Sequence, residues 1–463
     1  MKKLKSALPY ILIIFVAFFL RSWRYWEFPN TMETADEYAW TWLGSSILAD
    51  GQPTSWSYFA PYGEGYIYKQ GPVHAPLVRP AVDHPPLFAF IPGIAHLIAT
   101  NNWETLPDHR VIRIPMLFLG TLAVALLGYW TSLVLEKKWS LVATAIYAMV
   151  PVFVFSSRLV VSENFLILLL LILGILVHRW ENLSQKEKQK QNRIRIAFLL
   201  LGVAALLTKI SGILIPGILV SYALVRKDFP LFKLGILVTI ASITSLLLYA
   251  SYTNFPLFMA IQKQQTLLPI GLSTLYNRFF IYPNIANDIY YDGWLLLGFF
   301  GFVYALIKKD ISKIQPFWLF SILSTVVILG FIGITGGEYT FFGWYSYPIL
   351  PFFALFITLL LKEAYEEKYL LTILLWFFLL PTINNVFVHA TRTQLLTRTT
   401  IRMIYFLGAL PLLISLTPLK KYTKYAQLLL FVTILSASTL SVMTIDYTAR
   451  DLFQRSFWSE VRR

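Results

Sequence analysis

The chain of 463 residues contains no cysteine, and only 14% of its residues are charged. Without cysteine, neither disulfides nor thiolate metal sites can form. Soluble domains carry about 25% charged residues, so the low charge content and the 57% of hydrophobic residues indicate an integral membrane protein. The chain also lacks the glycine-rich fingerprint of a dinucleotide-binding domain, which argues against a Rossmann-type nucleotide site.

Acidic residues are scarce as well: 24 Asp and Glu stand against 39 Lys and Arg, which gives a net charge of +15. The basic residues lie in short connectors between apolar runs, where they indicate membrane orientation rather than a phosphate-binding face. We therefore expect no nucleic-acid partner. The 16% of aromatic residues fits interfacial belts and a groove for sugar or lipid equally well.

The apolar runs predict an all-α polytopic bundle of about 13 transmembrane helices, each of about 20 residues. We expect one transmembrane domain over residues 1–463, with no separate soluble C-terminal domain. The basic start and the absence of a small-residue cleavage site predict a retained first helix with a cytoplasmic N-terminus. The expected spans are 8–23, 111–135, 138–155, 164–180, 195–208, 211–226, 231–251, 292–307, 316–334, 341–361, 369–388, 400–417 and 425–443.

Between the first two spans lies a polar loop, residues 26–110. The spacing of Thr34 and Glu37 is that of a capping box and predicts an amphipathic helix along the membrane surface. Residues 49–81 are predicted to be irregular, and Asp83 to cap a second helix that ends near residue 99. That helix is too short to span the membrane. If it does not cross, the basic connectors fall in the cytoplasm and the loop lies outside.

On this topology, ionisable and aromatic side chains collect at the outer membrane level. Carboxylates supply a base for a hydroxyl, and cations stabilise a departing phosphate on a lipid tail. Asp36 and Glu163 could together hold a divalent ion through oxygen ligands, but we expect no obligatory metal or other cofactor. The candidates are Asp36, Glu37, Asp83, His84, Arg113, Arg158, Glu163, Lys209 and Tyr345.

Six short patterns lie in one order on this outer face. They are Asp36-Glu37, Asp83-His84-Pro85-Pro86-Leu87, Arg113-Ile114-Pro115, Arg158 to Glu163, Leu207-Thr208-Lys209, and Tyr345 to Pro351. Together they resemble the GT-C glycosyltransferases, in particular the branch of protein O-mannosyltransferases and lipid A aminoarabinose transferases. The match is close over about the first 215 residues and loose at the late aromatic segment. It departs from the family where Glu163 replaces the commoner aspartate.

The resemblance implies transfer of a sugar from a polyprenyl-phosphate donor to a hydroxyl acceptor on the extracytoplasmic face of the plasma membrane. It implies that Asp36 is the catalytic acid or base, and we place Glu37 and Glu163 beside it as catalytic candidates. Inversion at the anomeric carbon is expected. The substrate-binding candidates are Asp83, His84, Arg113, Arg158, Lys209 and Tyr345, with Lys209 and Arg158 on the donor phosphate.

Purely structural roles for the same residues also remain open. Carboxylates at helix starts stabilise the helix dipole, basic residues at the membrane level anchor or snorkel, and aromatic residues form interfacial belts. The alternative function is a multispan transporter or flippase of a lipid-linked saccharide, which would place charges near the midplane within paired repeats. An O-antigen polymerase or ligase is a third option, but such an enzyme would have its characteristic arginines in a large loop late in the chain.

Overall fold

The computed structural model describes residues 2–30, 34–70, 73–184, 187–266, 294–308, 314–335, 343–366 and 410–452, with a few isolated positions between them. Most of these residues are helical, and seven of the described helices are long and apolar enough to cross a membrane. The expected helical, multi-pass fold is therefore confirmed. The expected span at 369–388 lies outside the described residues except for Thr382, and the span at 400–417 is described only in part.

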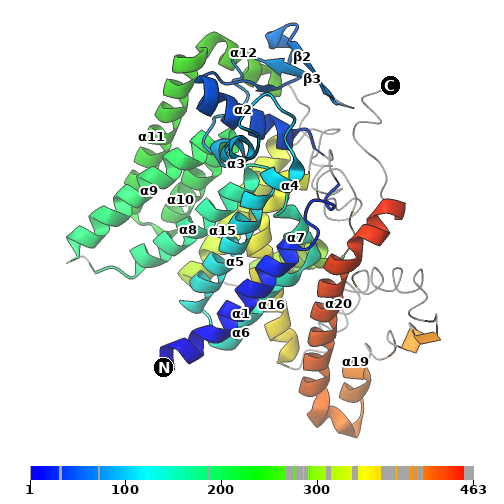
Figure 1. Cartoon of the computed structure of the whole chain (residues 1–463). Helices are drawn as coiled ribbons and strands as arrows, with labels where there is room; N and C mark the ends of the chain where they lie inside the picture. The colour runs from blue at the N-terminus through cyan, green and yellow to red at the C-terminus, as the bar shows by residue number, and fades with distance from the viewer. Residues whose placement is uncertain are drawn as a thin grey trace.

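The long helices form a bundle, and Figure 1 shows α1 running from the N-terminus at its lower end towards a cap at the upper end. One apolar core runs through the bundle, because most helices present Leu, Ile and Phe on several sides. The main helices are α1 (Lys2–Ser22), α5 (Ile114–Ser132), α6 (Lys137–Met149), α8 (Glu163–Glu181), α9 (Lys188–Thr208), α10 (Leu214–Arg226), α11 (Phe229–Thr253), α14 (Trp294–Lys308), α15 (Pro316–Thr335), α16 (Leu350–Tyr365) and α20 (Thr423–Leu452).

The structure shows two breaks near the ends of helices, one within an expected span and one between two expected spans. The span expected at 138–155 ends at Val150, and a short helix, α7 (Pro151–Ser156), begins at a proline that cannot donate to the preceding turn. The second break separates α9 from α10, where the extended residue Lys209 leads into the 3-10 turn η2 (Ile210–Ile213). The second break places the ionisable side chain of Lys209 at a helix end, where main-chain groups also need partners.

The first loop folds into a compact cap rather than into surface helices joined by irregular chain. It contains α2 (Asp36–Asp50), α3 (Phe90–Thr100) and a small antiparallel sheet that the sequence did not predict. In the sheet, β3 (Val73–Val78) lies between β1 (Ser55–Trp56) and β2 (Tyr66–Gln70). Helix α12 (Phe255–Thr266), also unpredicted, lies at the same upper end in Figure 1.

Helix α2 is buried on more than one face, unlike the amphipathic helix expected at this position. Its polar residues Thr41 and Ser45 are as buried as Trp40. The capping box is also absent. Thr34 Oγ1 does accept a hydrogen bond from the amide of Asp36, but the carboxylate of Glu37 points to other partners. Asp83 does not cap a helix, because α3 begins only at Phe90.

Helices α2 and α3 cross at a pair of glycines. A Cβ on Gly44 would lie 1.9 Å from the carbonyl oxygen of Ala89, and one on Gly93 would lie 2.5 Å from the amide nitrogen of Ser45. The two backbones can approach this closely only without side chains there. This crossing positions the start of α2, and with it Asp36, over the end of the helical bundle.

Candidate active site

The cation of the site is Lys209, in the break between α9 and α10. Its Nζ donates to Oε1 of Glu163 at 2.6 Å, and both side chains are largely buried. The same ammonium group lies 5.2 Å from the ring centroid of Tyr345. Glu163 is the first residue of α8, and Tyr345 lies in the 3-10 segment η5 (Gly343–Ile349) that leads into α16. Three distant segments therefore meet at Lys209.

Asp36, the first residue of α2, is half-buried. Its carboxylate interacts electrostatically with both members of this ion pair, Lys209 and Glu163. Burial raises the pKa of its carboxyl group to about 6, while the positive charge of Lys209 acts in the opposite direction. The neighbouring carboxylates of Glu163 and Asp83 add to the increase. Within the described residues, no hydrogen bond engages the Asp36 side chain, so this carboxylate can accept a proton from a substrate.

Asp83 and His84 reach the same region from the other side of the cap. The amide of Leu87 donates to the carbonyl oxygen of Leu207 at 3.0 Å, which ties this segment to the end of α9, two residues before Lys209. The ring of His84 stacks on Trp40 with centroids 4.6 Å apart. Burial, together with the positive charge of Lys209, lowers the pKa of His84 to about 3. His84 is therefore neutral at physiological pH.

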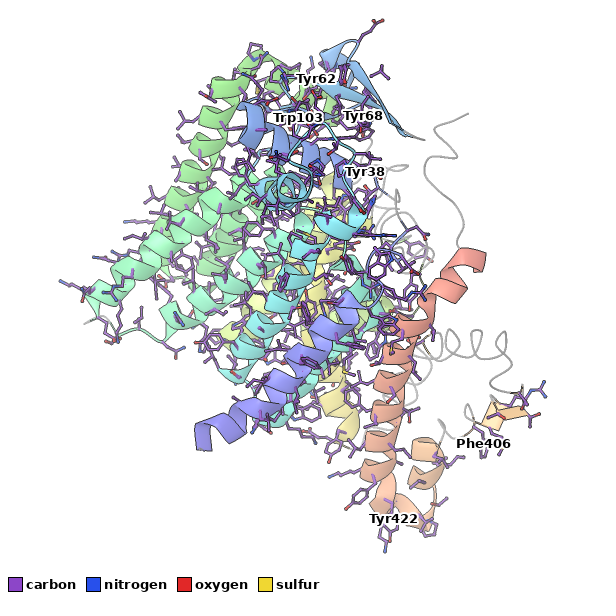
Figure 2. The ribbon with its side chains drawn as sticks, in the orientation of Figure 1. Tyr38, Tyr62, Tyr68, Trp103, Phe406 and Tyr422 are labelled. Atoms are coloured by element: carbon purple, nitrogen blue, oxygen red, sulfur yellow. The ribbon has the colours of Figure 1, made fainter. Side chains whose placement is uncertain are left out.

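Asp83 is held by residues that the sequence analysis did not single out. The hydroxyl of Tyr62 donates to its carboxylate and accepts from the amide of Val82. Burial raises the pKa of Asp83 to about 6, although hydrogen bonds from Tyr62 and Ser57 oppose the increase. Figure 2 shows Tyr62 in the cap near Trp103. No local pattern distinguishes Tyr62 among the many tyrosines of this loop, so its role emerges only from the fold.

Glu37 and Arg113 pair with each other rather than facing the Asp36–Lys209 group. Arg113 Nε and Nη2 donate to the two carboxylate oxygens of Glu37 at 2.8 and 2.7 Å. Glu37 also accepts from the amide of Val160 at 3.0 Å and lies 3.2 Å from Nε2 of His109. Burial favours the neutral acid, but Arg113 and His109 outweigh it and lower the pKa of Glu37 well below its usual range. Because these contacts engage both side chains within the fold, we propose structural roles for Glu37 and Arg113 in place of the catalytic and substrate-binding roles expected from the sequence.

Arg158 also forms hydrogen bonds within the fold. Its side chain is buried, and its three nitrogens donate to the carbonyl oxygens of Leu20, Arg21, Trp23 and Phe28 at 2.6 to 3.1 Å. These carbonyl groups lie at and just after the end of α1, where helical partners are missing. Arg158 therefore caps α1 from inside the protein, and the structure does not place it on the donor-phosphate site that the sequence suggested.

The six remaining candidates are brought together: Asp36, Asp83, His84, Glu163, Lys209 and Tyr345. Among the residues that the structure describes, no three His, Cys, Asp or Glu side chains are arranged to hold a metal ion. The arrangement offers one available carboxylate, one ion-paired lysine and a neutral imidazole. Such a group can take a proton from a hydroxyl and bind an anionic leaving group.

Comparison with known proteins matches part of this chain to a family model. The family model described as dolichyl-phosphate-mannose-protein mannosyltransferase matches residues 83–254. This segment contains four of the six site residues, and Asp36 and Tyr345 lie outside it. No curated protein matches the sequence.

Solved structures share the fold over nearly the whole chain. ArnT from Cupriavidus metallidurans in the apo state has a TM-score of 0.56 at 13% identity, with 96% of this chain and 77% of ArnT covered. The same protein bound to undecaprenyl phosphate has a TM-score of 0.54 at 14% identity, with 96% and 78% covered.

The archaeal oligosaccharyltransferase AglB from Archaeoglobus fulgidus, in complex with an inhibitory peptide and a dolichol-phosphate, has a TM-score of 0.53 at 12% identity. Here 96% of this chain is covered, but the chain spans only 56% of the length of AglB. The resemblance seen in the sequence is therefore confirmed, and the chain has the fold of the GT-C glycosyltransferases.

Proposed function

We propose that this protein transfers a hexose or pentose from a polyprenyl-phosphate donor to a hydroxyl acceptor on the extracytoplasmic face of the plasma membrane. The observation that carries the proposal is the position of Asp36, a half-buried carboxylate facing the Lys209–Glu163 ion pair at the capped end of the bundle. The binding of undecaprenyl phosphate and dolichol-phosphate by proteins of similar fold supports this class of donor.

In the proposed reaction, Asp36 accepts the proton of the acceptor hydroxyl. The acceptor oxygen forms a bond to the anomeric carbon while the bond from that carbon to the phosphate oxygen breaks. Polyprenyl phosphate leaves with the electron pair from the opposite face, so the configuration inverts. A positioned general base contributes roughly 10²–10⁴-fold to such a rate.

Lys209 is the proposed partner of the leaving phosphate. An ammonium group has three N–H donors, and Glu163 takes one of them at 2.6 Å. Glu163 thereby positions the ammonium group and leaves two donors for phosphate oxygens. His84, being neutral, contributes a hydrogen bond rather than a charge, while Tyr345 provides the aromatic wall beside the cation.

Asp83 is proposed to bind substrate hydroxyls, because Tyr62 already orients its carboxylate. No metal is needed, since Lys209 supplies the positive charge on the phosphate. The cavity beside Glu163 and Tyr345 has a volume of about 20 Å³, which holds about one water.

The experiment follows bond cleavage directly. Purified protein in vesicles is given polyprenyl-phosphate-linked hexoses and pentoses, together with membrane extract as a source of acceptors. Release of free polyprenyl phosphate with loss of sugar from the lipid, unchanged by EDTA, is the expected result. A transporter or flippase would instead move the intact lipid-linked sugar between leaflets. Translocation without cleavage for every donor would overturn the proposal.

A further inference from the structure

A second ligand site lies at the end of the bundle opposite the cap, between α6, α16 and α20. A groove of about 210 Å³ opens there between the three helices. Its lining is almost entirely apolar, with Trp139 and Val142 from α6, Leu361 from α16, and Leu430, Phe431 and Ile434 from α20. Figure 1 shows the lower ends of α16 and α20 far from α2 and the sheet, so the groove is separate from the proposed active site.

Two lysines converge at this groove on one aromatic ring. Lys138 Nζ lies 3.4 Å from the ring centroid of Tyr365 and 4.7 Å from that of Trp139. Lys424 Nζ lies 5.7 Å from the same Tyr365 centroid. Both lysines are exposed, and across the described part of the chain neither forms an ion pair with a carboxylate. Two like charges over one ring repel each other, and an anion between them would relieve this repulsion.

More positive charge continues from the groove along the chain. Lys420 and Lys421 lie in the 3-10 turn η6 (Pro418–Tyr422) directly before α20, and both are exposed. Figure 2 shows Tyr422 at the lower extremity of the molecule, beyond the foot of α20. The site therefore combines an apolar groove along the helices with cations at its mouth, and this matches the two chemistries of a phospholipid with an anionic headgroup.

We infer that the groove between α6, α16 and α20 binds an anionic phospholipid, with its phosphate between Lys138 and Lys424 and an acyl chain along Phe431 and Ile434. Aromatic rings at this level also suit the interface between headgroups and acyl chains. The occupant is a membrane lipid rather than a soluble phosphate, because a free anion would leave the apolar groove uncovered. This inference is independent of the proposed glycosyl transfer.

Fluorescence quenching tests the lipid directly, because Trp139 lines the groove. The protein is placed in phosphatidylcholine vesicles that contain either brominated phosphatidylglycerol or brominated phosphatidylcholine. The emission of Trp139 is obtained by subtracting the spectrum of Trp139→Phe from that of the wild type. Brominated phosphatidylglycerol should quench this component at a mole fraction lower by about 25-fold, since each of the two lysines near the headgroup contributes about fivefold.

In the double variant Lys138→Gln, Lys424→Gln the two lipids should quench equally, whereas the variant Lys190→Gln, at an exposed lysine near the start of α9, should keep the preference. In the wild type, high salt should also weaken the preference, which gives a readout that needs no variant. Equal quenching of the wild type by both lipids would contradict the inference. The absence of quenching by either lipid would mean that protein fills the groove, and would contradict it as well.

Discussion

Three carboxyl groups of the first loop, those of Glu37, Asp83 and Asp36, have different surroundings, and these surroundings decide what each group can do. Glu37 is fully buried and bound by Arg113, His109 and a main-chain amide, which keeps it ionised and static. Asp83 is oriented by Tyr62. Asp36 has a raised pKa and, among the described residues, no hydrogen-bond donor at its carboxylate. Only the last environment suits a group that exchanges a proton with a substrate.

Replacing Glu37 should therefore damage the fold rather than the chemistry. Glu37→Gln leaves the buried guanidinium of Arg113 without its counter-charge, and loss of one partner of a buried ion pair costs about 3–5 kcal/mol. We expect a lower thermal unfolding midpoint and a lower yield, with near-normal turnover per folded molecule. The exposed carboxylate variant Glu104→Gln serves as the control. A stable Glu37→Gln protein with abolished turnover would restore Glu37 to the catalytic group.

The raised pKa of Asp36 predicts the pH dependence of turnover. The base must be deprotonated, so turnover should increase as the pH rises through about 6 and then level off. At pH 5 about one tenth of a group with this pKa is ionised, so the rate should fall about tenfold from its plateau. Because Asp83 has a similar pKa, the profile of Asp83→Asn is the control and should keep this acid limb. A flat profile between pH 5 and 8 would contradict the assignment of the base.

At the scale of elements, the crossing of α2 and α3 holds Asp36 in place. It also predicts that a Gly→Ala substitution at the crossing destabilises the protein, although this substitution normally stabilises a helix. Alanine normally stabilises a helix interior relative to glycine by about 0.5–1 kcal/mol. At Gly44, however, the new methyl group would meet the carbonyl of Ala89, and overpacking costs about 1–3 kcal/mol. Gly44→Ala should lower both thermal stability and turnover. Gly217→Ala, whose methyl group would meet nothing within 4 Å, should be neutral or stabilising. Equal effects of the two substitutions would argue against a close α2–α3 contact.

The elements also show which parts of the fold can be read from the sequence. The long apolar runs predict the helices of the bundle well, because hydrophobic length alone determines a span. The cap is harder to predict. Its sheet strands are short, with β1 only two residues long, and α2 is buried on several sides because other parts of the cap cover it. Thr34 and Glu37 have capping-box spacing, but Arg113, which lies 76 residues further along the chain, takes the carboxylate instead.

The candidate site was predictable to the extent that its residues are polar in an apolar chain. Asp36, Glu163 and Lys209 stand out for that reason, and the structure brings them together. The sequence does not distinguish them from Arg113 and Arg158, which are equally polar and equally close to the outer level. Only the acceptors around each guanidinium group separate a structural arginine from one that is available to a substrate.

At the scale of the whole molecule, the cap and the N-terminus of α1 lie at opposite ends (Figure 1). If the N-terminus is cytoplasmic, as the basic connectors predict, the cap faces outwards. The chain has no native cysteine, so a single cysteine reports on its own position. Glu104→Cys, on the exposed turn after α3, should react with an impermeant maleimide added to intact cells. Gln189→Cys, at the exposed start of α9, should react only after lysis. The reverse pattern would place the site in the cytoplasm.

The central claim is that Asp36 acts as the base while Lys209 binds the donor phosphate. It is tested by measuring turnover and undecaprenyl phosphate affinity for Asp36→Asn and Lys209→Met beside the wild type. Asp36→Asn keeps the shape but not the basicity, so turnover should fall roughly 10²–10⁴-fold with affinity unchanged. Lys209→Met removes a charged donor worth about 1.5–3 kcal/mol, so affinity should weaken about tenfold or more. Near-normal turnover of Asp36→Asn on a cleaved donor would contradict the account.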